Sequence, residues 1–354
     1  MRSSSRTRRP WRPELTRLAI LGATGAVGST LLRVLEERSF PLEELRLLAS
    51  PRSAGALRRF AGRDITVQAV GPGSFDGIDI AIFSAGATRS REWAPHAVAA
   101  GAVVVDNSSA FRMDDGVPLV VADVNPHAAH AHAGVIANPN CSTMQLMPVL
   151  AVLHRRSPLE HVTVATYQSV SGTGQTAIDA LRAQSAAVLA GQEPPAGVYA
   201  HQIAFNVLPF AGALSGDDGY TDEELKLVNE SRKILELPDL RVSATCVRVP
   251  VVTSHSEAVW VRTREPIAPD EARALLAAEP GITVVDDPAA HAYPMAIDAE
   301  GRDDVLVGRI RRDLGDPNAL ALWVVADNLR KGAATNAVEI AELLVREKLV
   351  RSAA

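Results

Sequence analysis

The chain has 354 residues and a formal charge of −5, because 36 Lys and Arg stand against 41 Asp and Glu. Hydrophobic residues make up 47 % of it and aromatic residues 4 %, a composition that excludes collagen-like, coiled-coil and largely disordered proteins. The slightly acidic total provides no general attraction to nucleic acid or anionic membranes, and no apolar run approaches the ~18 residues of a membrane span. We therefore expect a partner of neither kind, and the length predicts about two domains.

The first 15 residues are expected to form a disordered basic tail. An export signal would need an apolar core and a small-residue cleavage site, and neither follows the arginines. The two cysteines, Cys141 and Cys246, are too few for a disulfide framework. This cysteine usage fits a reducing, cytoplasmic compartment.

Residues 16–140 alternate short apolar runs with helix-like stretches. This alternation predicts a parallel, doubly wound sheet covered on both faces, and the domain is completed by a carboxyl-terminal helix within 331–350. The predicted strands cover 18–21, 45–49, 78–83 and 102–105, and a helix is predicted over 25–36.

Residues 141–330 have longer strands with polar alternation. They predict a second, α+β domain with a mostly antiparallel sheet. Helices are predicted over 142–154 and from Thr221 to about Leu235, with a loop at 191–197. The strand-like runs are 162–169, 240–252, 258–263, 305–310 and 321–325.

A glycine loop follows the first predicted strand. It reads Gly22-Ala23-Thr24-Gly25-Ala26-Val27-Gly28. Glycines at this spacing allow a tight turn and a close approach of a diphosphate to the free N–H groups at a helix amino terminus. The segment predicts a dinucleotide site, although a tight turn without a ligand is the alternative.

The second predicted strand ends in a segment that bears on cofactor choice, Ala49-Ser50-Pro51-Arg52-Ser53. A site that prefers NAD places Asp or Glu here to bind the ribose hydroxyls. A guanidinium and hydroxyls suit a 2′-phosphate instead, so Arg52 and Ser53 favour NADP(H). A solvated arginine is the alternative.

Cys141 follows an Asn-Pro-Asn turn and opens a predicted helix. The helix dipole there is expected to lower the pKa of the thiol and make it nucleophilic. Asn140 could orient the thiol or donate to a developing oxyanion. A small buried side chain is the alternative for Cys141, and Cys246 is interpreted as core. On the same strand face Arg248 needs either an acidic ligand or a structural ion pair.

Among nine histidines, His255 stands at a predicted strand end near Arg248 and is a candidate acid/base. A second cluster, His127, His130 and His132, lacks the carboxylate or thiol that would complete a metal-ligand set, so no metal is expected. Thr221 and Glu224 fit a helix capping box. That leaves Glu223 one turn from Lys226, for a ligand or for a surface salt bridge.

Taken together, these segments resemble aspartate-β-semialdehyde dehydrogenases over about residues 17–350. Single motifs are weak signals, but their order and spacing are specific. The matching stretches are GATGAVG (22–28), ASPRSAG (49–55), NSSAFR (107–112), NPNCST (138–143), YQSVSGTG (167–174), TDEELKL (221–227), RVP (248–250), SHSEAV (254–259) and VADNLRKGAATNA (325–337).

The resemblance implies a Rossmann-like NADP-binding domain and a catalytic and dimerisation domain. It also implies a reaction in which NADPH reduces L-aspartyl-4-phosphate to L-aspartate-4-semialdehyde and phosphate, on the route to diaminopimelate, lysine, methionine and threonine. A homodimer through the second sheet is implied, with a tetramer left open.

Site roles follow from the resemblance position by position. Cys141 matches the nucleophile, His255 the acid/base and Gln168 the residue that orients the substrate. The expected substrate ligands are Asn140, Glu223 (rather than the adjacent Glu224) and Arg248, with Arg112 and Lys226 for phosphate. The expected cofactor contacts are Gly22, Thr24, Gly25, Ala26, Val27, Arg52, Ser53, Ser171, Gly172 and Asn328.

The sequence leaves two alternative functions to compare with this one. N-acetyl-γ-glutamyl-phosphate reductases use the same chemistry, but their cysteine usually lies in a Gly-Cys-Tyr-Pro context, whereas here it is Asn-Cys-Ser. A non-catalytic relative acting as a binding protein would have lost Cys141, Gln168 or His255, and all three are present.

Overall fold

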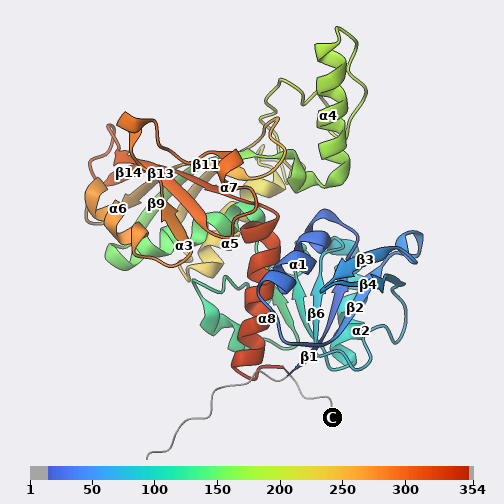
Figure 1. Cartoon of the computed structure of the whole chain (residues 1–354). Coiled ribbons are helices and arrows are strands. Elements are labelled where there is room, and N and C mark those ends of the chain that lie inside the picture. Colours follow the sequence, from blue (N-terminus) through green and yellow to red (C-terminus); the bar gives the residue numbers. More distant parts are fainter. Residues whose placement is uncertain (1–14, 351–354) are drawn as a thin grey trace, which may run out of the picture.

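The computed structural model describes residues 15–350 and consists of two α/β parts joined side by side (Figure 1). The predicted basic tail therefore lies almost wholly outside the described residues. No helix within 15–350 combines the length and the apolar character that crossing a membrane requires.

The first part is built on a six-stranded sheet in the order β5-β2-β1-β6-β7-β8. Every pairing in it is parallel, which confirms the predicted doubly wound sheet. Its strands are β1 (Thr16–Leu21), β2 (Leu42–Ala49), β5 (Gln68–Ala69), β6 (Ile80–Phe83), β7 (Val103–Asp106) and β8 (Val135–Ala137). A small antiparallel hairpin, β3 (Leu57–Phe60) and β4 (Arg63–Thr66), lies beside it.

Helices cover both faces of this sheet, which is why its strands are continuous apolar runs. In β1, Leu18 and Ile20 pack into one core cluster, whereas Ala19 and Leu21 pack into another on the opposite face. The covering helices are α1 (Ala26–Glu37) and α8 (Asn336–Arg346) on one face and α2 (Ala87–Ala99) on the other. The carboxyl-terminal helix thus completes the first part of the fold, as expected, although a π-helical turn, Arg330–Thr335, precedes it.

The second part has a mixed sheet in the order β10-β9-β11-β14-β13-β12. Its three central pairings are antiparallel, but the outer pairs β10–β9 and β13–β12 are parallel. The predicted mostly antiparallel sheet is confirmed, with a parallel pair at each edge; the helical segment between β9 and β10 is the crossover that one of these parallel pairs requires. The strands are β9 (Leu159–Gln168), β10 (Arg241–Arg248), β11 (His255–Thr263), β12 (Ile282–Val284), β13 (Val305–Arg312) and β14 (Ala319–Ala326).

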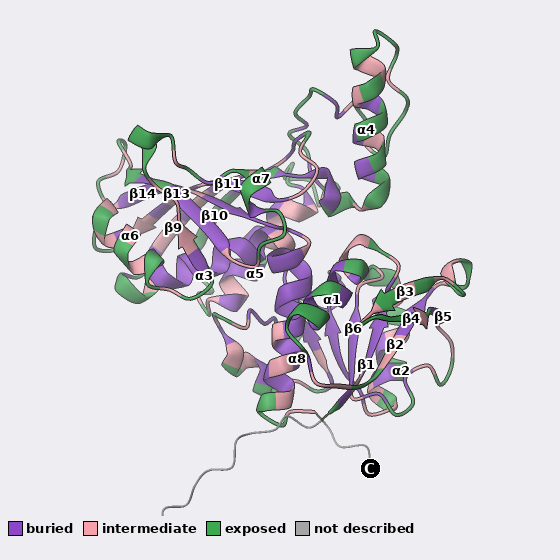
Figure 2. Cartoon of the chain, viewed as in Figure 1, coloured by how far each residue is buried: buried purple, intermediate pink, exposed green. Residues whose placement is uncertain are grey.

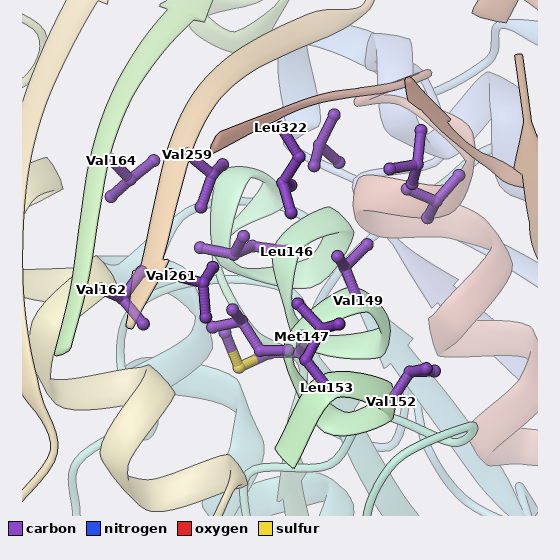
Figure 3. Packing of buried hydrophobic residues seen from close by; sticks show 14 of the residues in the cluster. Leu146, Met147, Val149, Val152, Leu153, Val162, Val164, Val259, Val261 and Leu322 are labelled. Atoms are coloured by element: carbon purple, nitrogen blue, oxygen red, sulfur yellow. The ribbon is translucent and has the colours of Figure 1, made fainter. Parts of the chain in front are cut away.

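One face of this sheet packs against α3 (Cys141–Arg156), whose middle turns are buried (Figures 2 and 3). Leu146 and Met147 meet Val259 and Val261 there, and each fully buried aliphatic side chain stabilises the fold by ~1.5–3 kcal/mol. This packing fixes the start of α3 relative to the ends of β9, β10 and β11. The other helices are α4 (Gln175–Leu189), which projects from the body, α5 (Asp222–Ile234), α6 (Pro269–Ala277) and α7 (Ala296–Ala299).

Candidate active site

Cys141 is the first residue of α3, and its sulfur lies 3.3 Å from Nε2 of His255. Asn140 caps this helix, because its side-chain oxygen accepts the N–H of Ser142 at 2.9 Å. The thiol faces a cavity of about 250 Å³ that both parts of the fold line. Beyond the predicted residues, its lining includes Ser84, Asn107, Ser109, Pro139, Leu329, Gly332 and Ala333.

The expected lowering of the thiol pKa is wrong for the ligand-free structure. Burial, and after it the negative charge of Glu223, raises the pKa of Cys141 to about 11. The Ser142 N–H at the helix start and the charges of Arg248 and Arg112 act in the opposite direction but are weaker. The helix start does lower the thiol pKa, but the loss of solvation on burial raises it by more, so the ligand-free site holds a protonated thiol at neutral pH.

His255 begins β11 and is fully buried. The Ser169 N–H donates to its Nδ1 at 3.0 Å, which holds the ring with Nε2 toward the sulfur. Burial and then the nearby charge of Arg248 keep the pKa of His255 well below its ordinary value. The ring is therefore neutral at pH 7 and can exchange a proton with groups in the cavity.

Strand register brings the other polar side chains to the same edge. Arg248 on β10 pairs directly with Gln168 on β9, and the Gln168 amide donates to Ser142 Oγ at 3.0 Å. Arg248 is buried, and its Nη1 donates to the Ser169 carbonyl at 2.7 Å. Its Nε has no partner among residues 15–350. A buried guanidinium with an unused donor suits a carboxylate ligand.

Helix α5 supplies an acid and a base to the opposite wall. The Glu223 carboxylate accepts from Asn140 Nδ2 at 2.8 Å and from Lys226 Nζ at 3.0 Å. Glu224 is occupied elsewhere, since it completes the predicted capping box with Thr221 and accepts the N–H of Cys246. Of the two neighbouring glutamates, Glu223 is therefore the one that lines the cavity.

Arg112 lies in the cavity wall, but much of its hydrogen-bonding capacity is committed. It pairs with the buried Glu230 at 3.0 Å and donates to the carbonyls of Asn138 and Asn107. The second oxygen of Glu230 accepts the Asn140 N–H at 2.7 Å. The sequence reasoning missed Glu230, although its spacing of seven from Glu223 and four from Lys226 places all three on one helix face.

The glycine loop is shaped to receive an anion. Gly22 has φ +95°, and a Cβ on it or on Gly28 would lie 2.3 Å from a backbone oxygen. No side chain caps α1, so the N–H groups of its first turn are available to a diphosphate. These features fit a dinucleotide. Val27 reaches the cavity from this loop, while Thr24, Gly25 and Ala26 lie around the helix start.

The remaining predicted cofactor contacts fall in two places. Ser171, Gly172 and Asn328 line the cavity, and the Ser171 hydroxyl donates to Asn328 Oδ1 at 3.0 Å. Arg52 and Ser53 lie in a short 3-10 helix directly after β2, next to the strand that leads into the glycine loop. Arg52 is exposed, so its guanidinium is accessible to a phosphate.

Other candidates lie away from this cavity. Cys246 is buried in the core, as interpreted from the sequence. His127 and His130 pair with Glu236 and Glu347, and His132 bonds to the carbonyl of Leu349. Within residues 15–350, no cluster of three or more His, Cys, Asp or Glu side chains is arranged to hold a metal ion.

Two family profiles cover most of the chain. The semialdehyde dehydrogenase NAD-binding domain matches residues 17–132, and the semialdehyde dehydrogenase dimerisation domain matches residues 150–331. An aspartate-semialdehyde dehydrogenase of Aquifex aeolicus is 53 % identical over 338 residues, which are 94 % of this chain and 99 % of that protein. The chain belongs to the aspartate-semialdehyde dehydrogenase family.

Further relatives agree with this family. The aspartate-semialdehyde dehydrogenase of Bacillus subtilis is 49 % identical and is matched over 94 % of this chain and 98 % of its own. The crystal structure of aspartate semialdehyde dehydrogenase II from Vibrio cholerae superposes with a TM-score of 0.92 at 48 % identity, covering 94 % of this chain and 99 % of that one. Family membership makes the chain an oxidoreductase with a nicotinamide cofactor.

Proposed function

We propose that this protein reduces L-aspartyl-4-phosphate to L-aspartate-4-semialdehyde with NADPH, through an acyl-thioester on Cys141. The observation that carries the proposal is the 3.3 Å contact between the Cys141 sulfur and His255 Nε2, in a cavity whose walls bear both acidic and basic side chains. A thiol beside a base is the arrangement that covalent acyl transfer requires.

The charges around the cavity match those of the substrate. Glu223 binds the ammonium group with the carboxylate that Lys226 contacts in the ligand-free site. Arg248 binds the α-carboxylate with its Nε, which is unpaired within residues 15–350. Lys226 and Arg112 hold the phosphate, with Asn140 and Gln168 placing the acyl carbon against the sulfur.

Substrate binding also activates the nucleophile. The ammonium group neutralises Glu223, one of the causes of the high thiol pKa. The Ser169 N–H on Nδ1 leaves the proton of the neutral His255 ring on Nε2, where it donates to the sulfur and favours the thiolate. The thiol proton then passes to the phosphate dianion as the S–C bond forms and the C–O bond breaks.

The second half of the reaction uses the same groups. The amino terminus of α1, with Arg52 and Ser53 for the 2′-phosphate, would hold NADPH, which would supply the hydride for the thioester carbon. The backbone N–H of Cys141 and neighbouring donors stabilise the negative charge that develops on the thioester oxygen. Collapse of this adduct breaks the S–C bond and releases the aldehyde and a thiolate, which is again hydrogen-bonded by Nε2 of His255 and takes up a proton from solvent.

The phosphate requirement tests this mechanism. In the oxidative direction, reduction of NADP⁺ by aspartate semialdehyde should need added phosphate or arsenate, and turnover without either would contradict the thioester route. Cys141→Ser should bind NADPH and show no turnover. N-acetylglutamate semialdehyde serves as the comparison substrate, because an acylated amine gives Glu223 no ammonium group to bind; equal rates with the two would favour the related reductase.

We further propose that two copies of the chain associate through the outer face of the second sheet in the cytoplasm, where the two free cysteines remain reduced. That face exposes Tyr167, Tyr293, Met295 and Ile297, and an apolar pocket of about 610 Å³ opens beside Trp323. A monomeric mass in sedimentation equilibrium would contradict the dimer. The product is an intermediate of amino-acid biosynthesis toward diaminopimelate, lysine, methionine and threonine.

A further inference from the structure

A π-helical turn lies directly behind the nucleophile. Its six residues, Arg330–Thr335, are all buried, and the turn packs against both α1 and α3. It therefore contacts the helix that begins at the glycine loop and the helix that begins at Cys141. π-Helical turns are rare and often occur at functional sites.

Gly332 in this turn faces Cys141 at close range. A Cβ on Gly332 would lie 2.9 Å from Cβ of Cys141, 3.3 Å from its Cα and 3.4 Å from its carbonyl oxygen. The φ of Gly332 is not in the left-handed region, so its backbone conformation does not demand glycine. In a helix interior alanine is favoured over glycine by ~1 kcal/mol. The space beside Cys141, rather than the local backbone, therefore accounts for glycine here.

The turn itself is held too firmly to move away. Lys331 is almost fully buried and pairs with Asp123 at 2.5 Å. Arg330 pairs with Glu37 at 2.5 Å and with Asp303 at 2.9 Å, which ties the turn to both parts of the fold. An added methyl group at position 332 would therefore displace the start of α3 and with it the sulfur that contacts His255.

We propose that Gly332 is a positioning residue that sets the distance between the Cys141 sulfur and His255 by leaving room for the Cys141 Cβ. The inference rests on the proposed function in that Cys141 is the nucleophile. Gly332 acts through Cys141 and through no contact with the reacting atoms, so its loss should lower the reactivity of the sulfur while the cofactor still binds.

The first test compares Gly332→Ala with Gly71→Ala, a glycine with nothing within 4 Å of a built Cβ and no positive φ. Alkylation by iodoacetamide reports on Cys141 without any turnover, with Cys141→Ser as the blank. We expect Gly332→Ala to change the alkylation rate and its pH midpoint and to lower kcat by about tenfold to a hundredfold, as small misplacements of reacting groups do. The KM for NADP⁺ should stay close to that of Gly71→Ala.

A double-mutant cycle with Cys141→Gly tests the contact independently of catalysis. If the Cβ of Cys141 is what the new methyl group meets, Gly332→Ala should lower the unfolding temperature less in the Cys141→Gly background than in the wild type. The assignment is overturned if Gly332→Ala leaves the alkylation rate and kcat unchanged. It is also overturned if the two substitutions change the unfolding temperature additively, or if neither Gly332 variant folds. Retained turnover in Cys141→Ser would instead overturn the proposed mechanism. The double-mutant cycle would still test the contact between positions 332 and 141, because it compares unfolding temperatures.

Discussion

Arg112 and Glu230 form a buried ion pair, 3.0 Å between Nη1 and Oε1, at the back of the candidate site. Because the other oxygen of Glu230 accepts the Asn140 N–H, this pair connects a proposed phosphate ligand to the residue that caps the nucleophile's helix. Arg112 keeps N–H groups that are free for a ligand, and its orientation is set by Glu230 and two carbonyls. Glu230 thus supports the site without lining it.

Replacing Glu230 should therefore destabilise the fold. Glu230→Gln leaves the Arg112 guanidinium buried beside a neutral group, and removing one partner of a buried pair costs ~3–5 kcal/mol. Urea unfolding measures this loss. Glu236→Gln is the control, because that exposed carboxylate pairs with the exposed His127 and should change stability by less than ~1 kcal/mol. Equal losses in the two variants would show that the buried pair contributes nothing particular.

The strands and the polar edge of the second sheet were predictable because period-two patterns and local motifs encode them. Cys141, Gln168 and Arg248 all reach one cavity, and His255 lies behind it against the Cys141 sulfur, although the four come from different elements. Glu230 was not predictable in the same way, since a glutamate on the polar face of a helix has the pattern of a solvated residue. Its burial depends on Arg112, which is 118 residues away in the chain.

Two further errors have the same origin. The helix-start argument for a low Cys141 pKa is local, whereas burial, which raises the pKa to about 11, arises from the packing of the whole site. The sequence also predicts one continuous final helix, but the segment begins with a π-helical turn wedged between α1 and α3. Both depend on tertiary contacts that periodicity does not encode.

Glu223 should affect both substrate affinity and thiol reactivity. Glu223→Gln removes a negative charge that raises the pKa of Cys141, so this pKa should fall. Because the thiolate is the reactive form, alkylation of Cys141 by iodoacetamide at about pH 7.5 should become faster. The variant also loses the proposed ammonium ligand, so the KM for aspartate semialdehyde should rise by about tenfold or more. Asp222→Asn is the matched control, because it removes an acid that also pairs with Lys226. Slower alkylation in Glu223→Gln would contradict the electrostatic role.

Arg52 should set the cofactor preference. Arg52→Ala removes the exposed guanidinium that follows β2, and we expect the ratio of kcat/KM for NADP⁺ over NAD⁺ to fall by about tenfold to a hundredfold, mostly through the KM for NADP⁺. Arg58→Ala, in the neighbouring hairpin strand β3, controls for a general loss of positive charge. If Arg52→Ala retains the full preference, another group binds the 2′-phosphate.

Glu257 should make the stability of the protein depend on pH. It lies on β11 two residues after His255 and is completely buried, and within 15–350 the Gln145 side chain is its polar neighbour, although the two do not reach hydrogen-bond geometry. It pairs across the sheet with Thr166, which in turn pairs with Cys246, so it belongs to a layer one pleat below Arg248 and Gln168. Burial raises the pKa of Glu257 well above its ordinary value. The folded protein therefore holds this carboxyl group protonated under conditions in which the unfolded chain ionises it.

The sign of the effect follows from linkage. Unfolding releases the Glu257 proton at any pH above the unfolded pKa of ~4.3, so this group's contribution to stability is complete below that pH and falls as the pH rises toward the folded pKa. Glu257→Gln keeps the shape of the neutral carboxyl group and cannot ionise. In urea unfolding measured from pH 4 to pH 8, the variant should match the wild type near pH 4 and become increasingly more stable than the wild type as the pH rises toward the folded pKa, with a slope of at most about 1.4 kcal/mol per pH unit. Glu300→Gln, which changes an exposed carboxylate, should show no such trend. A stability difference between Glu257→Gln and the wild type that is the same at both ends of this range would mean that Glu257 is ionised in the folded protein.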